Sequence, residues 1–226
     1  MIKNFVFLLA LFCSSIAWSQ KVFFNHMEKV HDNNEKIFYR LPQNFDEAEY
    51  LGELEIQGFS NDDVEVFSKV YAKAKEIGAN TFAYSPIPSV DGTVQKFDPW
   101  NYRLKLFYYP QKNIPTPENV AIIFGSPVND TKMVINRKKI DLPMRSYIKQ
   151  PLAEGASYRL GTGNLLGSTV MLTGKLDQSI QYFQIGGPSM RGEGGFLNFK
   201  SGDIVLLERS YADFLTVIYT ELSIKN

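Results

Sequence analysis

Alternating apolar and polar positions in the first half of the chain predict a small α/β unit. Within 52–57, Leu54 and Ile56 face one way, while the glutamates and the glutamine between them face the other. This period of two is typical of a half-buried strand. The segments 81–84 and 102–109 are also predicted to be strands, which makes strand, helix, strand, strand the minimal order.

The helix of this unit is predicted between the first two strands. Ser60 is the expected N-cap, with Asp63 three residues later and the charge of Asp62 in the first turn. Gly78 is expected to end the helix, because glycine readily adopts the left-handed conformation. The apolar stripe consists of Val64, Phe67, Tyr71, Ala74 and Ile77.

The second half of the chain reads mainly as β-structure. The segments 132–135 and 140–142 flank a polar four-residue connection, 136–139, and together they predict a hairpin. Short β-prone runs separated by glycine-rich turns then favour a β-sandwich. These runs are 157–160, 168–173, 180–185, 196–199 and 203–207.

A helix is predicted at the end of the chain, packed on the sheet. Ser210 and Asp213 are the expected N-terminal capping pair. The apolar residues with helical spacing are Tyr211, Phe214, Leu215, Ile218, Tyr219 and Leu222.

The seam between the two halves is a proline-rich segment. Three prolines in 110–118 remove backbone donors and favour an extended linker, placed at 110–119. The expected fold class is α+β, with a small α/β domain at 20–109 and a β-sandwich-like domain with a C-terminal helix at 120–226. The polar stretch 20–35 is expected to cover the surface.

The first nineteen residues have the order of a secretory signal peptide. Lys3 precedes the apolar run 5–12, and Ala17 and Ser19 suit cleavage before Gln20. The apolar run is shorter than the roughly 20 residues that span a bilayer, so no transmembrane helix is expected in the mature chain. A glutamine just after the cut resembles exported proteins of the Bacteroidetes. The expected location is the periplasm or the periphery of the outer membrane.

Cys13 is the only cysteine, and it offers an alternative in which a lipid anchor is attached there. A lipoprotein signal needs a small residue before the cysteine, whereas Phe12 stands there, so we expect Cys13 to be removed with the signal. The full chain has 24 basic and 24 acidic residues. Removal of Lys3 with the signal leaves 23 basic and 24 acidic residues, so the mature chain has a net charge of −1. This balance gives no indication of a nucleic-acid partner.

The segment from Ala72 to Phe82 resembles a signature of small bacterial envelope domains, an alanine-rich helix that ends in Gly-Ala-Asn before a strand. Such domains include the YbjQ-like heavy-metal-binding family and the lipoprotein sensor of the Rcs envelope-stress pathway. The likeness covers 52–86 and implies a fold more than a function. More loosely, 136–139, 154–156 and 181–183 resemble small β-rich modules of bacterial lipoproteins.

The two histidines are the first candidates for chemistry. His26 and His31 have acidic neighbours, but they are five residues apart, whereas two ligands on one helix face need a spacing of three or four. A solvated segment is the preferred interpretation. No Gly-x-Ser-x-Gly elbow accompanies them. We therefore predict no catalytic residue, no metal site and no cofactor.

Two glycine-rich stretches are interpreted as loops. In 161–167 the last glycine is one residue too late for a dinucleotide fingerprint and a β-prone run follows, so a hairpin turn is expected. The stretch 186–195 lacks the Lys-Ser/Thr ending of a phosphate loop. Arg191 within it is a candidate for partner contact.

Large aromatic residues near 98–102 supply the other candidates for partner contact. Trp100 and Tyr102 bury much area at low entropic cost when they contact a protein or a carbohydrate. The alternative is that they are core aromatics at the end of the first sheet. Overall, the sequence favours a non-enzymatic envelope protein that binds another envelope protein as an accessory component of an assembly. The alternatives are a small-ligand or metal-binding stress protein and an enzyme.

Overall fold

The computed structural model describes residues 20–41, 47–89, 91, 93, 97–114, 119–162, 167–186, 199–201 and 204–223. Within this part, two α-helices accompany fifteen strands arranged in three sheets. The expected α+β class is confirmed in its β-rich form.

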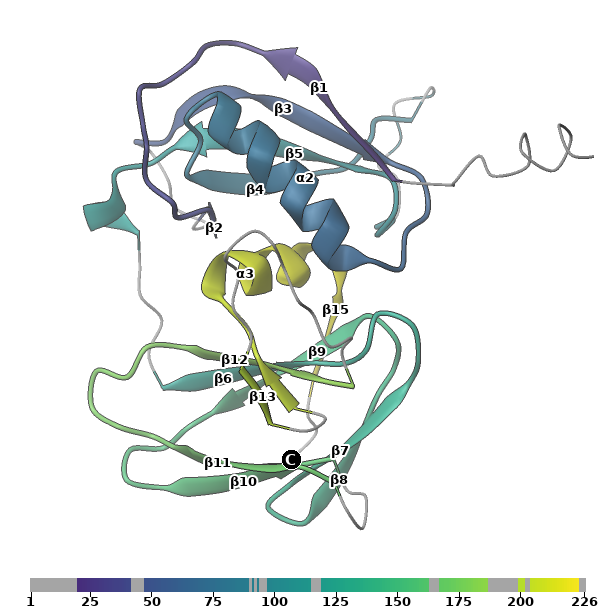
Figure 1. Ribbon diagram of the computed structural model, residues 1–226, viewed down its shortest axis with the longest axis vertical. Helices are drawn as coiled ribbons and strands as arrows, with labels where there is room; N and C mark the ends of the chain where they lie inside the picture. The colour runs from purple at the N-terminus through teal and green to yellow at the C-terminus, as the bar shows by residue number, and fades with distance from the viewer. Residues whose placement is uncertain are drawn as a thin grey trace, which may run out of the picture.

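The first half of the chain forms a five-stranded sheet in the order β1-β3-β5-β4-β2. Only the pairing of β2 with β4 is parallel. Helix α2 (Asp63–Glu76) lies across one face of this sheet (Figure 1). The strands are β1 (Lys21–Met27), β2 (Tyr39–Arg40), β3 (Glu49–Gln57), β4 (Thr81–Ser85) and β5 (Tyr102–Tyr108).

The start of α2 lies two residues later than predicted. Asp62 is the N-cap, because its carboxylate accepts a hydrogen bond from the Glu65 backbone N–H at 3.0 Å. Ser60 instead accepts a bond from the Asp62 N–H, also at 3.0 Å. The predicted role of Gly78 is confirmed, since it follows the C-cap residue Ile77 with φ of +75°.

The segment 20–35 does more than cover the surface, because it contributes the edge strand β1. This strand pairs with β3, and its Val22 and Phe24 pack against the main core. On β3, Glu53 and Glu55 are buried, each only 7% exposed. The reason is Arg103 on β5, whose guanidinium lies 3.3 Å from Glu53 and 2.7 Å from Glu55.

The second half contains two sheets, one four-stranded in the order β11-β10-β7-β8 and one six-stranded in the order β13-β14-β12-β6-β9-β15. Apolar side chains from both sheets form one core cluster, which includes Ile123 of β6, Met133 of β7 and Leu160 of β10. The strands are β6 (Val120–Phe124), β7 (Thr131–Ile135), β8 (Lys138–Leu142), β9 (Ser146–Pro151), β10 (Ser157–Gly161), β11 (Thr169–Thr173), β12 (Gln181–Ile185), β13 (Phe199–Ser201), β14 (Ile204–Leu206) and β15 (Thr220–Leu222).

The predicted hairpins at 132–142 and 157–173 are both present, as the antiparallel pairs β7–β8 and β10–β11. The connection between β7 and β8 is shorter than expected. Asn136 and Arg137 alone form the turn, both with positive φ, 48° and 72°. Lys138 and Lys139 already belong to β8.

Helix α3 (Arg209–Ile218) lies between the first sheet with α2 and the sheets of the second half (Figure 1). Its N-cap is Glu208, whose carboxylate accepts from the backbone N–H groups of Ser210 and Tyr211, so the predicted Ser210 cap is wrong. The helix ends at Ile218, because Tyr219 is extended and leads into β15.

One hydrophobic cluster joins the two halves across α3. The Phe67 ring of α2 lies 5.4 Å from the rings of Tyr211 and Phe214 of α3. The same cluster contains Leu54 of β3 and Phe124 of β6. The division into domains at 110–119 stays a prediction, and the halves on either side of it share this core.

Candidate functional site

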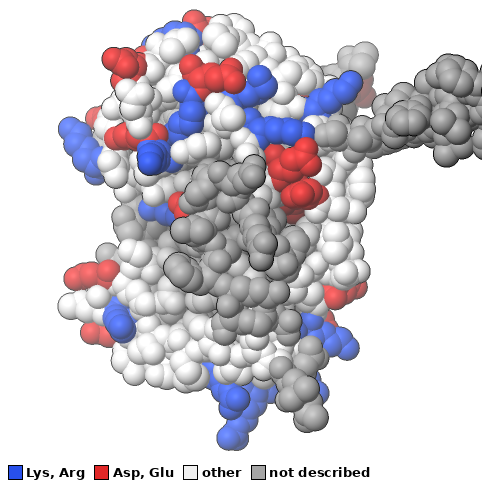
Figure 2. Space-filling model, viewed as in Figure 1, with Lys and Arg blue, Asp and Glu red and all other residues white. Residues whose placement is uncertain are grey.

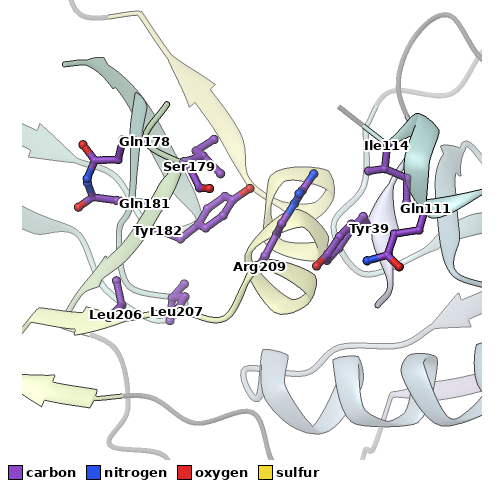
Figure 3. Close-up of a pocket in the computed structure, with 11 residues that line it drawn as sticks. Tyr39, Gln111, Ile114, Gln178, Ser179, Gln181, Tyr182, Leu206, Leu207 and Arg209 are labelled. Atoms are coloured by element: carbon purple, nitrogen blue, oxygen red, sulfur yellow. The ribbon is translucent and has the colours of Figure 1, made fainter. Parts of the chain in front are cut away.

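A cavity of about 670 Å³ lies at the junction of the two halves, beside the short helix η1 (Gln111–Asn113). Its volume is in the range of about 300–1,000 Å³ that is common for ligand pockets, which often form between domains. The walls come from β2, η1, the start of β12 and the segment before it, β14 and the start of α3 (Figure 3). The lining residues are Tyr39, Gln111, Ile114, Gln178, Ser179, Ile180, Gln181, Tyr182, Leu206, Leu207 and Arg209.

Arg209 supplies the positive charge of the cavity. It is the first residue of α3 and extends between Tyr182 on one side and Tyr39 on the other (Figure 3). Its guanidinium carbon lies 4.0 Å from the centre of the Tyr39 ring, which is a cation–π contact across the two halves. The Arg209 Nε atom also lies 3.6 Å from the carboxylate of Asp213, one turn further along the helix.

Asp213 supports the cavity wall from behind. Its carboxylate accepts hydrogen bonds from the Tyr182 hydroxyl at 2.9 Å and from the Arg40 backbone N–H at 3.3 Å. Burial raises the pKa of this carboxyl to about 6, although Arg209 and the hydrogen bonds favour the charged form. Burial and the neighbouring Asp213 together raise the pKa of the Tyr182 hydroxyl. The network joins α3, β12 and β2.

The raised pKa of Asp213 predicts a pH dependence of stability. The folded protein binds this proton more tightly than the unfolded chain, whose aspartates titrate near pH 4. The stabilising contribution is therefore complete below about pH 4 and is lost as the pH rises through about 6. Relative to Asp213→Asn, the wild type is expected to lose about 2–3 kcal/mol of unfolding free energy between these limits.

Urea titrations of both proteins between pH 4 and 7 measure this difference. Burial also raises the pKa of Asp63, but Asp63 is present in both proteins, so its contribution cancels in the comparison. Parallel stability curves for the two proteins would contradict the prediction.

The lining of the cavity combines hydrogen-bonding groups with aliphatic surface. Gln111, Gln178 and Gln181 can each donate and accept through an amide, and the aliphatic side chains of Ile114 and Leu206 stand among them. Such a lining suits a ligand that carries both amide or hydroxyl groups and apolar parts. An extended peptide segment has this combination.

A buried ion pair also joins the halves, next to Trp100. Arg145 Nη2 donates to Asp63 Oδ1 at 2.7 Å and to the Ser60 carbonyl at 2.8 Å. The Tyr219 hydroxyl donates to the other oxygen of Asp63 at 2.8 Å. The Arg145 and Asp63 side chains are only 6% and 4% exposed. This cluster links the start of α2 to the second half.

The predicted contact residues have different positions. Trp100 is half-buried, with its ring 5.9 Å from the Arg145 guanidinium and 5.4 Å from the Phe59 ring. Tyr102 is fully buried in the main core, so its side chain is not exposed to a partner, as the alternative of a core aromatic expects. Arg191 lies outside the described residues. Neither Trp100 nor Tyr102 lines the cavity.

The histidines remain apart from each other. His26 contacts Glu28 at 3.0 Å, whereas His31 stacks on the Tyr108 ring at 3.7 Å and lies 3.8 Å from Glu49. In the described part of the chain, no group of three or more His, Cys, Asp or Glu side chains could hold a metal ion.

The Gly-Ala-Asn segment has a clear structural role. Asn80 is fully buried, and its amide donates to the Tyr109 carbonyl and accepts from the Tyr109 N–H, both at 2.8 Å. It also donates to Glu35 at 2.7 Å, which ties the segment after β1 to the end of β5. Ala79 is fully buried as well.

Comparison of the chain with protein-family models, curated proteins and solved structures finds no match. The resemblance to envelope domains therefore stays a prediction. Neither described helix has the length and apolarity that crossing a membrane requires.

Proposed function

We propose that this chain is an exported, non-enzymatic binding protein of the bacterial cell envelope, and that it holds an extended segment of another envelope protein in the cavity between its halves. The observation that carries the proposal is the cavity itself, a half-open space of about 670 Å³ lined by four separate segments of the chain. The signal-peptide pattern of residues 1–19 supports export, to the periplasm or the outer-membrane periphery.

The chemistry of the cavity favours a peptide over a small ion. The amides of Gln111, Gln178 and Gln181 match the donors and acceptors of a peptide backbone, and the aliphatic side chains around them offer contacts for apolar side chains of the segment. Arg209, stacked on Tyr39, adds a cation that can pair with a carboxylate of the segment. Binding then needs no catalytic group.

We further propose that the second half is a β-sandwich domain. Its four-stranded and six-stranded sheets share one hydrophobic cluster, as facing sheets do. In this interpretation 110–119 is a linker between two domains, and α3 is the element that fixes the linked domains around the cavity.

A bulky side chain at the cavity wall is expected to block binding. Ser179 lines the cavity and is exposed, so Ser179→Trp fills the space with little cost to the core. Native gels of the cells that export the protein measure the fraction of the protein that is in high-molecular-weight complexes. For Ser179→Trp this fraction is expected to be at least about tenfold lower than for the wild type.

Ser68→Trp is the matched control, because Ser68 is also an exposed serine and lies on α2 outside the cavity. It is expected to leave the complexes unchanged. Equal complex formation by the two variants would argue against the cavity as the binding site, and the absence of any complex with the wild type would argue against a binding function.

A further inference from the structure

Basic side chains gather at the hairpin β7–β8, on the part of the molecule remote from the cavity. Between 131 and 142 the chain has four cations, Lys132, Arg137, Lys138 and Lys139, and one acid, Asp141, a local charge of +3. The chain as a whole has 24 of each sign, so the remaining residues carry −3. Figure 2 shows Lys and Arg side chains projecting at the lower end of the molecule, where Figure 1 places β7 and β8.

The outer face of the four-stranded sheet extends this charge. Met133 and Leu160 point inward to the core cluster, so their neighbours Lys132 and Arg159 project from the opposite face. Both cations are exposed. Within the part of the chain that the structure describes, no ion pair engages Lys132, Arg137, Lys139 or Arg159.

The turn holds Arg137 at a position where glycine would cost less. Two-residue turns with both φ angles positive favour Asn-Gly, and a left-handed conformation is unfavourable for a side chain with a Cβ atom. Here the pair is Asn136-Arg137, with φ of 48° and 72°. A costly residue with an exposed charge at the tip of a hairpin indicates that the charge is used.

The composition of this face identifies the kind of partner. Met171 is 59% exposed and is the register partner of Arg159, so an apolar side chain stands beside the cations. Cations combined with a protruding apolar side chain are typical of surfaces that bind the headgroup region of a membrane. The outward-facing residues of β7, β8, β10 and β11 include no aromatic side chain, whereas sites for sugars and single-stranded nucleic acids use aromatic stacking.

We propose that the hairpin β7–β8, with Arg159 and Met171 beside it, binds a membrane surface that carries anionic phospholipid headgroups. Phosphate groups accept hydrogen bonds from Arg137 and attract the lysines of β8, while Met171 enters the headgroup region. This surface is separate from the cavity, so a membrane-bound molecule keeps its cavity accessible. The proposal does not depend on the proposed function.

Vesicle sedimentation tests the proposal with the protein purified from cells that export it. The wild type is expected to sediment with vesicles of phosphatidylglycerol and phosphatidylcholine, and not with vesicles of phosphatidylcholine alone. About 1 M salt, where the Debye length falls to about 3 Å, should release it. Each cation near an anionic bilayer strengthens binding about fivefold, so the triple variant of Arg137, Lys138 and Lys139 to Gln should bind roughly a hundredfold more weakly.

The control variant replaces Lys21, Lys105 and Lys112 by Gln, which removes the same charge from exposed positions elsewhere and should bind as the wild type does. The single variant Arg137→Gly shows whether a loss of binding comes from misfolding, because glycine adopts the positive φ at this position without strain. This variant should still bind the anionic vesicles about fivefold more weakly than the wild type, since it lacks one cation. Equal losses in the two triple variants, binding to neutral vesicles, or binding to soluble heparin but to no vesicle would overturn the proposal.

Discussion

The Arg145→Ala protein is expected to unfold with a free energy about 3–5 kcal/mol below that of the wild type. Arg145 is the only cation that contacts Asp63 among the ion pairs of the described residues, and both side chains are almost fully buried. Removal of the guanidinium leaves the Asp63 carboxylate with the Tyr219 hydroxyl but without a counter-charge. An unpaired buried charge is far more costly than the net value of the pair.

A lower pH should reduce the loss of unfolding free energy in Arg145→Ala. Burial already raises the pKa of Asp63 against the effect of Arg145, and the pKa rises further when Arg145 is absent. The destabilisation of Arg145→Ala is therefore expected to become smaller as the pH is lowered, because a growing fraction of the carboxyl then binds a proton and becomes neutral.

Urea unfolding followed by circular dichroism and by Trp100 fluorescence measures the effect. Trp100 lies beside Arg145 and is the only tryptophan after Trp18, which the signal peptide would remove. Lys149→Ala is the control, since the Lys149–Glu221 pair has a similar distance of 2.8 Å but is about half exposed. It should cost less than about 1 kcal/mol. An equally small loss in Arg145→Ala would show that the buried pair does not hold the halves together.

Gly78→Ala is expected to produce little folded protein, or a protein destabilised by about 3 kcal/mol or more. A Cβ atom at Gly78 would lie 2.0 Å from the backbone carbonyl oxygen of His31, and φ there is +75°. The backbone around His31 has little freedom to move, because the His31 N–H donates to the Ile77 carbonyl and Asn33 donates to the Gly78 carbonyl, both at 3.0 Å.

Gly155→Ala separates the clash from the backbone conformation. Gly155 has a nearly equal φ of +72°, but an added Cβ atom there meets nothing within 4 Å. It should cost only about 1–2 kcal/mol, the penalty of the left-handed conformation alone. Thermal unfolding of both variants measures the difference. Similar melting temperatures would mean that the contact between the helix end and His31 does not constrain the fold.

Local patterns predicted the elements whose signals lie within a few residues. Helix α2, the strands β3 to β5 and the hairpins of the second half follow from apolar periodicity and turn residues. Gly78 was identified because a helix end needs a left-handed residue. The N-cap positions differ from the predicted ones because neighbouring side chains can bond the same backbone N–H groups. Asp62 and Glu208 accept these hydrogen bonds in place of Ser60 and Ser210.

Elements that depend on distant partners were missed. Tyr219 and Leu222 continue the helical spacing of α3, yet β15 forms because its residues pair in parallel with β9, more than seventy positions earlier. Strand β1 contains four apolar residues, but the adjacent Phe23 and Phe24 break the alternation of a half-buried strand, and β1 is stabilised by pairing with β3. The run 120–124 is continuously apolar, so its composition could have indicated β6.

The cavity had no local signal. Tyr39 and Arg209 are 170 positions apart in the sequence and meet only because α3 returns to the two-residue strand β2. The glutamines of the wall look like ordinary solvated residues in sequence. The aromatic residues that the sequence predicted as partner contacts are Trp100 and Tyr102. They lie in or beside the core that joins the two halves.

Photo-crosslinking in the cells from which the protein comes tests most directly whether the cavity binds a segment of another protein. A benzophenone amino acid at position 179 faces the cavity, and the same group at position 68 on α2 faces outward. The proposed function predicts one discrete protein adduct after irradiation from position 179 and none from position 68. No adduct from position 179, or the same adduct from both positions, would contradict it.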